Sequence, residues 1–223
     1  MSNFTLSTEF SQQDLERFYA TGTNVVIAKP NGGGVPNVAW IVFRPLLKNH
    51  VNWSEEYAIY ASNTSLTNGA VITQISSTQH PAVANKLYTF TPSGTFGPPS
   101  SGGSEGSYSV ENDYENLPKG YLTMGLSQKA SVNGNDTGLS VVSAASVLYR
   151  STAVITPFTI IYLWTQSQVV SNSVVTRVTS QMTKITLGDG VTEVSLKYDP
   201  ESGQFLSKSR NEGIQVTHPQ LTL

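Results

Sequence analysis

The chain has 223 residues, a net charge of −2 and no cysteine, and 13% of its residues are charged, about half the usual share of roughly 25%. Without a basic field, nucleic acid is not an expected partner, and without cysteine there are no disulfides, thiolate metal sites or cysteine nucleophiles. Serine and threonine make up roughly a quarter of the chain, which is typical of sheet faces that stay wet on one side.

The first ten residues lack the basic and apolar regions of a secretory signal peptide. No apolar run approaches the roughly 20 residues that cross a bilayer as a helix. We therefore expect a protein that is cytoplasmic as synthesised, or released without a secretory signal peptide.

A short helix is predicted within residues 10–22. Ser11 can cap its start, Asp14 lies near the positive end of its dipole, and Gly22 suits its stop. We interpret this helix as a packing element that lies across one end of the sheets.

The predicted centre of the core is a hairpin. Residues 38–43 are an unbroken apolar run, which is typical of a strand buried on both faces. Residues 48–50 form a polar link to a second strand over residues 51–61. This arrangement places Trp40 and Trp53 in adjacent strands.

Further strands are predicted over residues 24–28, 70–75, 86–90, 121–128 and 138–149. Turns or turn-rich links are predicted at residues 68–69, 131–138 and 187–190, and a last hairpin at residues 196–205. Residues 151–187 are nearly free of breakers, and Ser171 to Ser173 are predicted to be the turn between two long threonine-rich strands. The side chains expected to be almost fully buried are Trp40, Phe43, Phe158, Ile160 and Trp164.

These elements predict an all-β fold: a single antiparallel β-sandwich or jelly-roll-like domain over residues 1–223 with one short N-terminal helix. The tail, residues 208–223, is polar, and we expect it to be flexible or to pair with a neighbouring strand.

A recognition surface is predicted in the long loop of residues 92–120, which is rich in glycine, serine and proline and then acidic. Long loops on a rigid β scaffold present side chains without disturbing the core. Tyrosine offers an apolar face and a hydroxyl, and asparagine and aspartate can pair with sugar hydroxyls. The residues predicted to bind sugar or lipid headgroups are Tyr108, Asp113, Tyr114, Asn116 and Tyr121. The competing interpretation is that these tyrosines fold back as a lid on the core.

Catalytic and metal sites are not expected. Ser104 lies in a G-x-S-x-G match, but this match lacks the strand before it and the helix after it that a nucleophile elbow needs. His50, His80 and His218 lie far apart, without metal-ligand spacing. Glu55 and Glu56 are neighbours on opposite faces of a strand, so one of them can point inward and suit acid catalysis.

The sequence therefore predicts a non-enzymatic surface-recognition protein without a cofactor, of lectin-like or membrane-binding cytolysin-like type. A glycan or a membrane surface is the expected partner, and a homo-oligomer is expected. For the cytolysin type, the low charge around Ser171 to Ser173 suits a membrane-inserting hairpin. One alternative is a self-assembling structural β-subunit of a particle, filament or crystal. A second alternative is a hydrolase whose site is assembled from distant residues.

Overall fold

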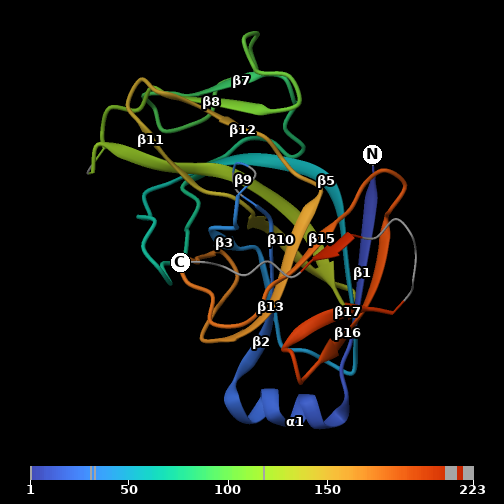
Figure 1. Cartoon of the computed structure of the whole chain (residues 1–223). Coiled ribbons are helices and arrows are strands. Elements are labelled where there is room, and N and C mark those ends of the chain that lie inside the picture. The colour runs from blue at the N-terminus through green and yellow to red at the C-terminus, as the bar shows by residue number, and fades with distance from the viewer. Residues whose placement is uncertain (1, 31, 33, 118, 209–214, 218–223) are drawn as a thin grey trace.

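The computed structural model describes residues 2–30, 32, 34–117, 119–208 and 215–217. It is 50% strand and 5% helix, with several sheets packed together, so the predicted all-β, sandwich-like fold with one short helix is confirmed. The helix lies at one end of the molecule, and a small sheet lies at the other end (Figure 1).

The largest sheet has eight strands and lies between the helix and the small sheet (Figure 1). Its strand order is β10-β9-β5-β1-β16-β17, with β11 paired to β9 and β6 paired to β5. Its strands are β1 (Asn3–Glu9), β5 (Lys48–Ser62), β6 (Ser76–Ser77), β9 (Tyr121–Val132), β10 (Asn135–Val141), β11 (Ala145–Leu148), β16 (Glu193–Asp199) and β17 (Gln204–Ser207).

A second sheet packs against the largest one, in the order β18-β15-β13-β2-β4, and the third sheet has the order β12-β8-β7. Their strands, with the short pair β14 and β3, are β2 (Thr23–Ala28), β3 (Val38–Ala39), β4 (Ile41–Phe43), β7 (Leu87–Phe90), β8 (Tyr108–Asn112), β12 (Thr152–Ile155), β13 (Ile160–Ser167), β14 (Ser173–Val174), β15 (Thr183–Thr186) and β18 (Gln215–Thr217). Among the described strands, the pairing is antiparallel except for two parallel pairs, β1 with β16 and β7 with β8.

The helix α1 (Gln12–Thr21) forms where the sequence predicts it. The Ser11 hydroxyl accepts the Asp14 N–H at 3.1 Å, the Ser11 N–H donates to the Asp14 carboxylate, and Gly22 closes the helix with a left-handed φ of 64°. Leu15 and Phe18 are buried on the inner face. Local capping is sufficient to define both ends of this helix. In the described part of the chain, no helix is both long enough and apolar enough to cross a membrane.

The strand β5 carries a bulge that bends it between the two ends of the molecule. Trp53 pairs with Ala130 and Tyr57 with Gln128, so three residues of β5 face one residue of β9. Such a bulge interrupts the ladder and re-aims the side chains within it. The part of β5 that follows the bulge lies beside the third sheet, where the Tyr57 ring is 5.8 Å from another tyrosine ring.

The predicted hairpin of Trp40 and Trp53 is wrong. The apolar run breaks at Trp40, because β3 pairs with β14 whereas β4 pairs with β2. Residues 48–50 are not a link but the first part of β5, paired with β1. Trp40 and Trp53 belong to opposite layers, and their rings meet edge to face at 5.7 Å across the interior.

The predicted long hairpin around Ser171 to Ser173 is also absent. Residues 168–182 contain only the two-residue strand β14 in regular structure. The Ser171 hydroxyl accepts the Val42 N–H at 2.8 Å, and the Asn172 amide oxygen accepts the Val141 N–H at 2.7 Å. These side chains cap other segments, so this region does not form the two threonine-faced strands on which the membrane-inserting hairpin depended.

Four further expectations can be compared with the structure. Residues 70–75 carry one isolated bridge rather than a strand. The link at residues 131–138 is only the Asn133-Gly134 turn between β9 and β10, since both strands run further than predicted. The turn at residues 187–190 is present, but it connects β15 to β16, which belong to different sheets. Of the predicted tail, 209–214 and 218–223 lie outside the described residues, and β18 pairs with β15.

Burial follows the layers rather than the apolar runs. Trp40 and Trp164 are completely buried, as predicted. Phe43, Phe158 and Ile160 are only half-buried, which corrects the expectation for these three. Phe158 precedes β13, and Ile160 and Phe43 lie at strand ends, where the covering layer is incomplete.

Candidate functional site

The five residues predicted to form a recognition surface differ in how far they are exposed. Tyr108 begins β8 and is only 6% exposed; its ring packs 5.8 Å from that of Tyr57, and burial raises the pKa of its phenol. A ring held in the core cannot stack on a ligand at the surface. Tyr121 begins β9, is half-buried, and directs its hydroxyl to the Ser65 hydroxyl at 3.4 Å.

Asp113, Tyr114 and Asn116 share the loop that follows β8. Asn116 is exposed, whereas Asp113 and Tyr114 are half-buried. The Tyr114 ring lies 5.7 Å from the Phe90 ring, and the Asp113 N–H donates to the Phe90 carbonyl at 2.9 Å. The Tyr114 ring therefore packs against the core at Phe90 of β7, as the competing interpretation expects of a lid.

A pocket of about 380 Å³ lies next to these residues, at the end of the molecule that carries the third sheet. The segment of residues 77–83 forms one wall, and residues 96–99 form the other. The lining has apolar and uncharged polar side chains, from Ser77, Thr78, Gln79, Pro81, Val83, Tyr88, Phe96, Gly97, Pro98 and Pro99.

The first wall is held against β5 and β7. Thr78 makes two hydrogen bonds with the backbone of Ile59. The Thr78 N–H donates to the Ile59 carbonyl at 2.9 Å, and the Thr78 hydroxyl accepts the Ile59 N–H at 3.0 Å. The Ala82 N–H donates to the Tyr57 carbonyl at 2.7 Å, and the Val83 N–H donates to the Tyr88 hydroxyl at 2.7 Å. The hydroxyl of Tyr88 can still donate its own hydrogen into the pocket.

The second wall is held against β7. The Phe96 ring packs 4.9 Å from the Phe90 ring, and the Gly97 N–H donates to the Thr89 carbonyl at 2.9 Å. The Tyr114 ring also packs on Phe90, so the predicted recognition loop supplies both the second wall and a ring that packs beside it. Both walls are therefore formed before any ligand arrives.

The sequence reasoning missed most of this pocket. Residues 96–99 fall inside the predicted loop of residues 92–120, whereas residues 77–83 lie between two predicted strands, where the sequence indicates no site. The sequence signal is limited to the prolines themselves, Pro81 before the strand β7 and the pair Pro98 and Pro99 after it. No feature of either segment's own sequence indicates that residues 77–83 and 96–99 lie side by side.

A second candidate is a buried ion pair between the two main layers. The Lys29 Nζ lies 2.8 Å from Glu55 Oε1 and donates to the Tyr57 hydroxyl at 2.9 Å. The same Nζ lies 5.3 Å from the ring centroid of Trp40 and 5.2 Å from that of Tyr57. Of the two glutamates in the bulge, Glu55 is therefore the one that points inward.

Glu55 is fully engaged there. Trp53 Nε1 donates to Oε1 at 3.2 Å, and the Tyr57 hydroxyl donates to Oε2. Burial lowers the pKa of the Lys29 amine, while Glu55 opposes that shift. The void beside Lys29 is only about 10 Å³, roughly the space of one water. A substrate has no room to reach the amine, so this cluster joins the layers rather than serving as a site for chemistry.

Two of the remaining catalytic candidates, Ser104 and His50, each lie beside a serine hydroxyl. Ser104 is exposed in an irregular loop, and its N–H donates to the Ser109 hydroxyl. His50 pairs with the Ser7 hydroxyl at 3.0 Å on the outer face of the largest sheet. His218 lies outside the described residues. Over the residues that the structure describes, no group of histidine and acidic side chains is arranged to hold a metal ion.

Comparison with protein-family models, with curated proteins and with solved structures finds no match for this chain.

Proposed function

We propose that this protein binds neutral carbohydrate in the pocket between residues 77–83 and 96–99, without transforming it. The observation that carries the proposal is the composition of the lining, which combines an aromatic ring and prolines with hydroxyl and amide groups. Sugars present both apolar C–H faces and uncharged hydroxyls, so they are matched by such a surface.

Charge supports a neutral ligand. The lining residues include no aspartate, glutamate, lysine, arginine or histidine among those that the structure describes. An ionic ligand would lose hydration there without gaining an opposite charge. The same lining offers no pair of carboxylates of the kind that glycoside hydrolysis uses, which favours binding over cleavage.

Preorganisation supports useful affinity. Thr78 and Gly97 are bonded to neighbouring strands, one on each wall. A ligand entering a formed pocket avoids the entropy of ordering its walls. Ser77 and Gln79 are exposed at the rim, where they can exchange hydrogen bonds with sugar hydroxyls without weakening the core.

The test is binding of the full chain to neutral oligosaccharides on a glycan array, with affinity measured by titration calorimetry. Phe96→Ala and Gln79→Ala should each weaken binding by about tenfold, a change equivalent to one lost stacking or well-placed polar contact. Gln181→Ala, an exposed glutamine outside the pocket, is the matched control and should bind as the unaltered chain does.

Gln79→Ala separates a binding effect from a folding effect, because its side chain is exposed. Absence of binding to every neutral glycan, or an equal loss in Gln181→Ala and Gln79→Ala, contradicts the proposal. Release of a shortened oligosaccharide would contradict the non-enzymatic part of it.

A further inference from the structure

The loop between β4 and β5 exposes two adjacent leucines. Leu46 is 51% exposed and Leu47 is 49% exposed, and Tyr19 of α1, 39% exposed, lies against the same loop. The Tyr19 hydroxyl donates to the Pro45 carbonyl at 2.7 Å, and the Arg44 guanidinium lies 3.7 Å from the Tyr19 ring centroid. We call this surface, made by Tyr19, Arg44, Leu46, Leu47 and Lys48, the leucine tip.

The backbone of the leucine tip is bonded to the protein rather than left to solvent. The Leu46 N–H donates to the Asn49 amide oxygen at 2.8 Å, and the Leu46 carbonyl accepts from the Asn49 amide nitrogen at 2.9 Å. The Leu47 carbonyl accepts the Phe10 N–H at 3.0 Å. Asn49 is completely buried, so a core amide is devoted to this loop.

This bonding matters because a loop that enters an apolar medium loses water as a partner for its backbone groups. An ordinary surface loop leaves those groups to water. In the loop that carries the leucine tip, the carbonyls of Pro45, Leu46 and Leu47 and the N–H of Leu46 are bonded internally. The two leucine side chains remain exposed. That combination suits shallow insertion into the interfacial layer of a lipid bilayer.

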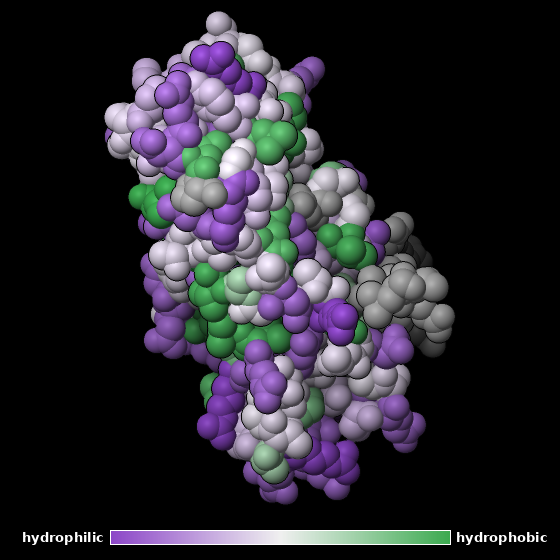
Figure 2. All heavy atoms as spheres, turned by 90° about the vertical axis from the view of Figure 1, so that its left-hand side faces the viewer, coloured by the Kyte–Doolittle hydropathy of each residue, from purple (hydrophilic) through white to green (hydrophobic). Residues whose placement is uncertain are grey.

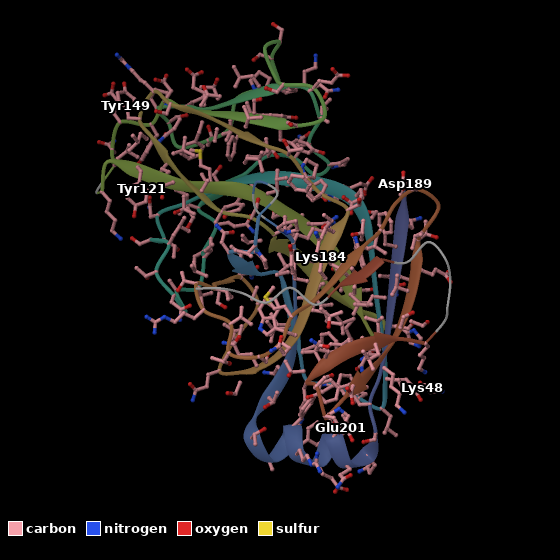
Figure 3. The ribbon with its side chains drawn as sticks, in the orientation of Figure 1. Lys48, Tyr121, Tyr149, Lys184, Asp189 and Glu201 are labelled. Atoms are coloured by element: carbon pink, nitrogen blue, oxygen red, sulfur yellow. The ribbon has the colours of Figure 1, made fainter. Side chains whose placement is uncertain are left out.

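Cationic groups lie where headgroup phosphates would meet the tip. Arg44 and Lys48 flank the leucines in the chain, and both are exposed. Lys48 points outward near the end of the molecule that carries α1 (Figure 3). A hollow of about 200 Å³ begins at Lys48 and is lined, among others, by His50, Lys208 and the hydroxyls of Ser7 and Ser195.

The charged side chains in the hollow favour an anionic partner. Among its described lining residues, Glu9 is the only carboxylate, and it is paired with Lys208. Lys48 has no ion pair within the described part of the chain. The exposed leucines lie beside a cationic, hydroxyl-lined hollow. This pair of features complements an anionic bilayer, which has anionic headgroups at its surface and apolar acyl chains beneath them.

We infer that the leucine tip docks on an anionic lipid bilayer, with Leu46 and Leu47 in the interface and Lys48 beside a headgroup phosphate. This site is separate from the proposed carbohydrate pocket, because Tyr88 of that pocket belongs to β7. The strand β7 and the helix α1 lie at opposite ends of the molecule (Figure 1). Figure 2 shows another face of the molecule, on which exposed hydrophobic groups lie mainly over the middle with hydrophilic groups around them.

The experiment is flotation of the full chain with phosphatidylcholine vesicles, with and without phosphatidylserine, free of any glycolipid. We expect binding to the anionic vesicles that weakens as salt is added. The double variant Leu46→Ser with Leu47→Ser should reduce binding by about tenfold or more, and Lys48→Gln by about fivefold. Leu148→Ser and Lys129→Gln are the matched controls, since both residues are exposed elsewhere, and they should bind normally.

A fluorescence measurement distinguishes insertion of the leucine tip into the bilayer from electrostatic attraction to its surface. A Leu47→Trp variant should show a blue-shifted emission and quenching by brominated lipid when anionic vesicles are added. The inference is overturned if the unaltered chain fails to float at low salt, if the controls lose as much as the tip variants, or if the tip variants instead abolish a dimer seen by sedimentation. Phe96→Ala should float normally, so failure of the carbohydrate proposal leaves this result readable.

Discussion

The Lys29 ammonium on the second sheet lies 2.8 Å from the Glu55 carboxylate on the largest sheet, with 4% and 19% of the two side chains exposed. This ion pair spans the interior between the layers, and the bulge in β5 is what aims Glu55 at it. Taking two charges out of water is costly, so such a pair stabilises a fold only when each charge keeps its partner.

Removing one member of the pair should be far worse than removing both. Lys29→Met or Glu55→Leu alone should lower the free energy of unfolding by about 3–5 kcal/mol, because a buried charge loses its partner. The double variant should recover most of that loss. Urea denaturation of the four proteins measures the coupling, and additive losses in the double variant would show that the two charges act independently.

Stability should fall in alkaline solution because of buried phenols. Burial raises the pKa of Tyr57 and Tyr60 above the ordinary value, which is about 10. Above that pH the unfolded chain releases protons that the folded chain keeps, so the contribution of these groups is complete below pH 10 and is lost as the pH rises. The pKa of Lys29 is lowered, so its contribution to the free energy of unfolding rises with pH and opposes that of the two tyrosines.

Tyr60→Phe should reduce the alkaline loss, because phenylalanine has no proton to release. The measurement is the free energy of unfolding in urea between about pH 9 and about pH 11.5, a range that spans the ordinary tyrosine pKa. Tyr121→Phe, at a half-buried position, is the control. An identical pH slope in Tyr60→Phe and the unaltered protein would contradict this account.

Tyr114→Ala should lower the melting temperature by several degrees, because the Tyr114 ring packs on Phe90 and the core behind it. Tyr114→Phe keeps the ring and should melt normally. If Tyr114→Ala melts normally but no longer binds carbohydrate, the tyrosine belongs to the recognition surface that the sequence predicts rather than to the support of the pocket.

Gly125→Ala should be strongly destabilising. A Cβ at Gly125 would lie 1.9 Å from the Ser143 carbonyl oxygen, so β9 and the segment after β10 would have to separate. Gly97→Ala is the matched control, since its Cβ would meet only ordinary contacts of 3.7 Å. Thermal unfolding of both variants distinguishes this steric effect from the general effect of replacing glycine, and equal melting temperatures would contradict it.

The elements that could be read from the sequence are those with local causes. The helix begins at the Ser11 cap and stops at Gly22 because both signals act within one turn of the chain. The hairpin of β16 and β17 forms for a similar reason, since Gly203 supplies the positive φ at its turn. The all-β class follows from β-branched residues and frequent turns, which also act locally.

Tertiary structure alone decided the rest, because each missed feature depends on partners distant in the chain. Trp40 lies between two strands because β3 and β4 pair with different neighbours. Asn172 lies in the predicted turn, but the strand β14 that follows it pairs with β3 rather than with the strand before the turn. The pocket exists because Thr78 is bonded to β5 while Gly97 is bonded to β7. Strand pairing over such separations is selected by the packing of whole layers, and no short stretch of residues contains that information.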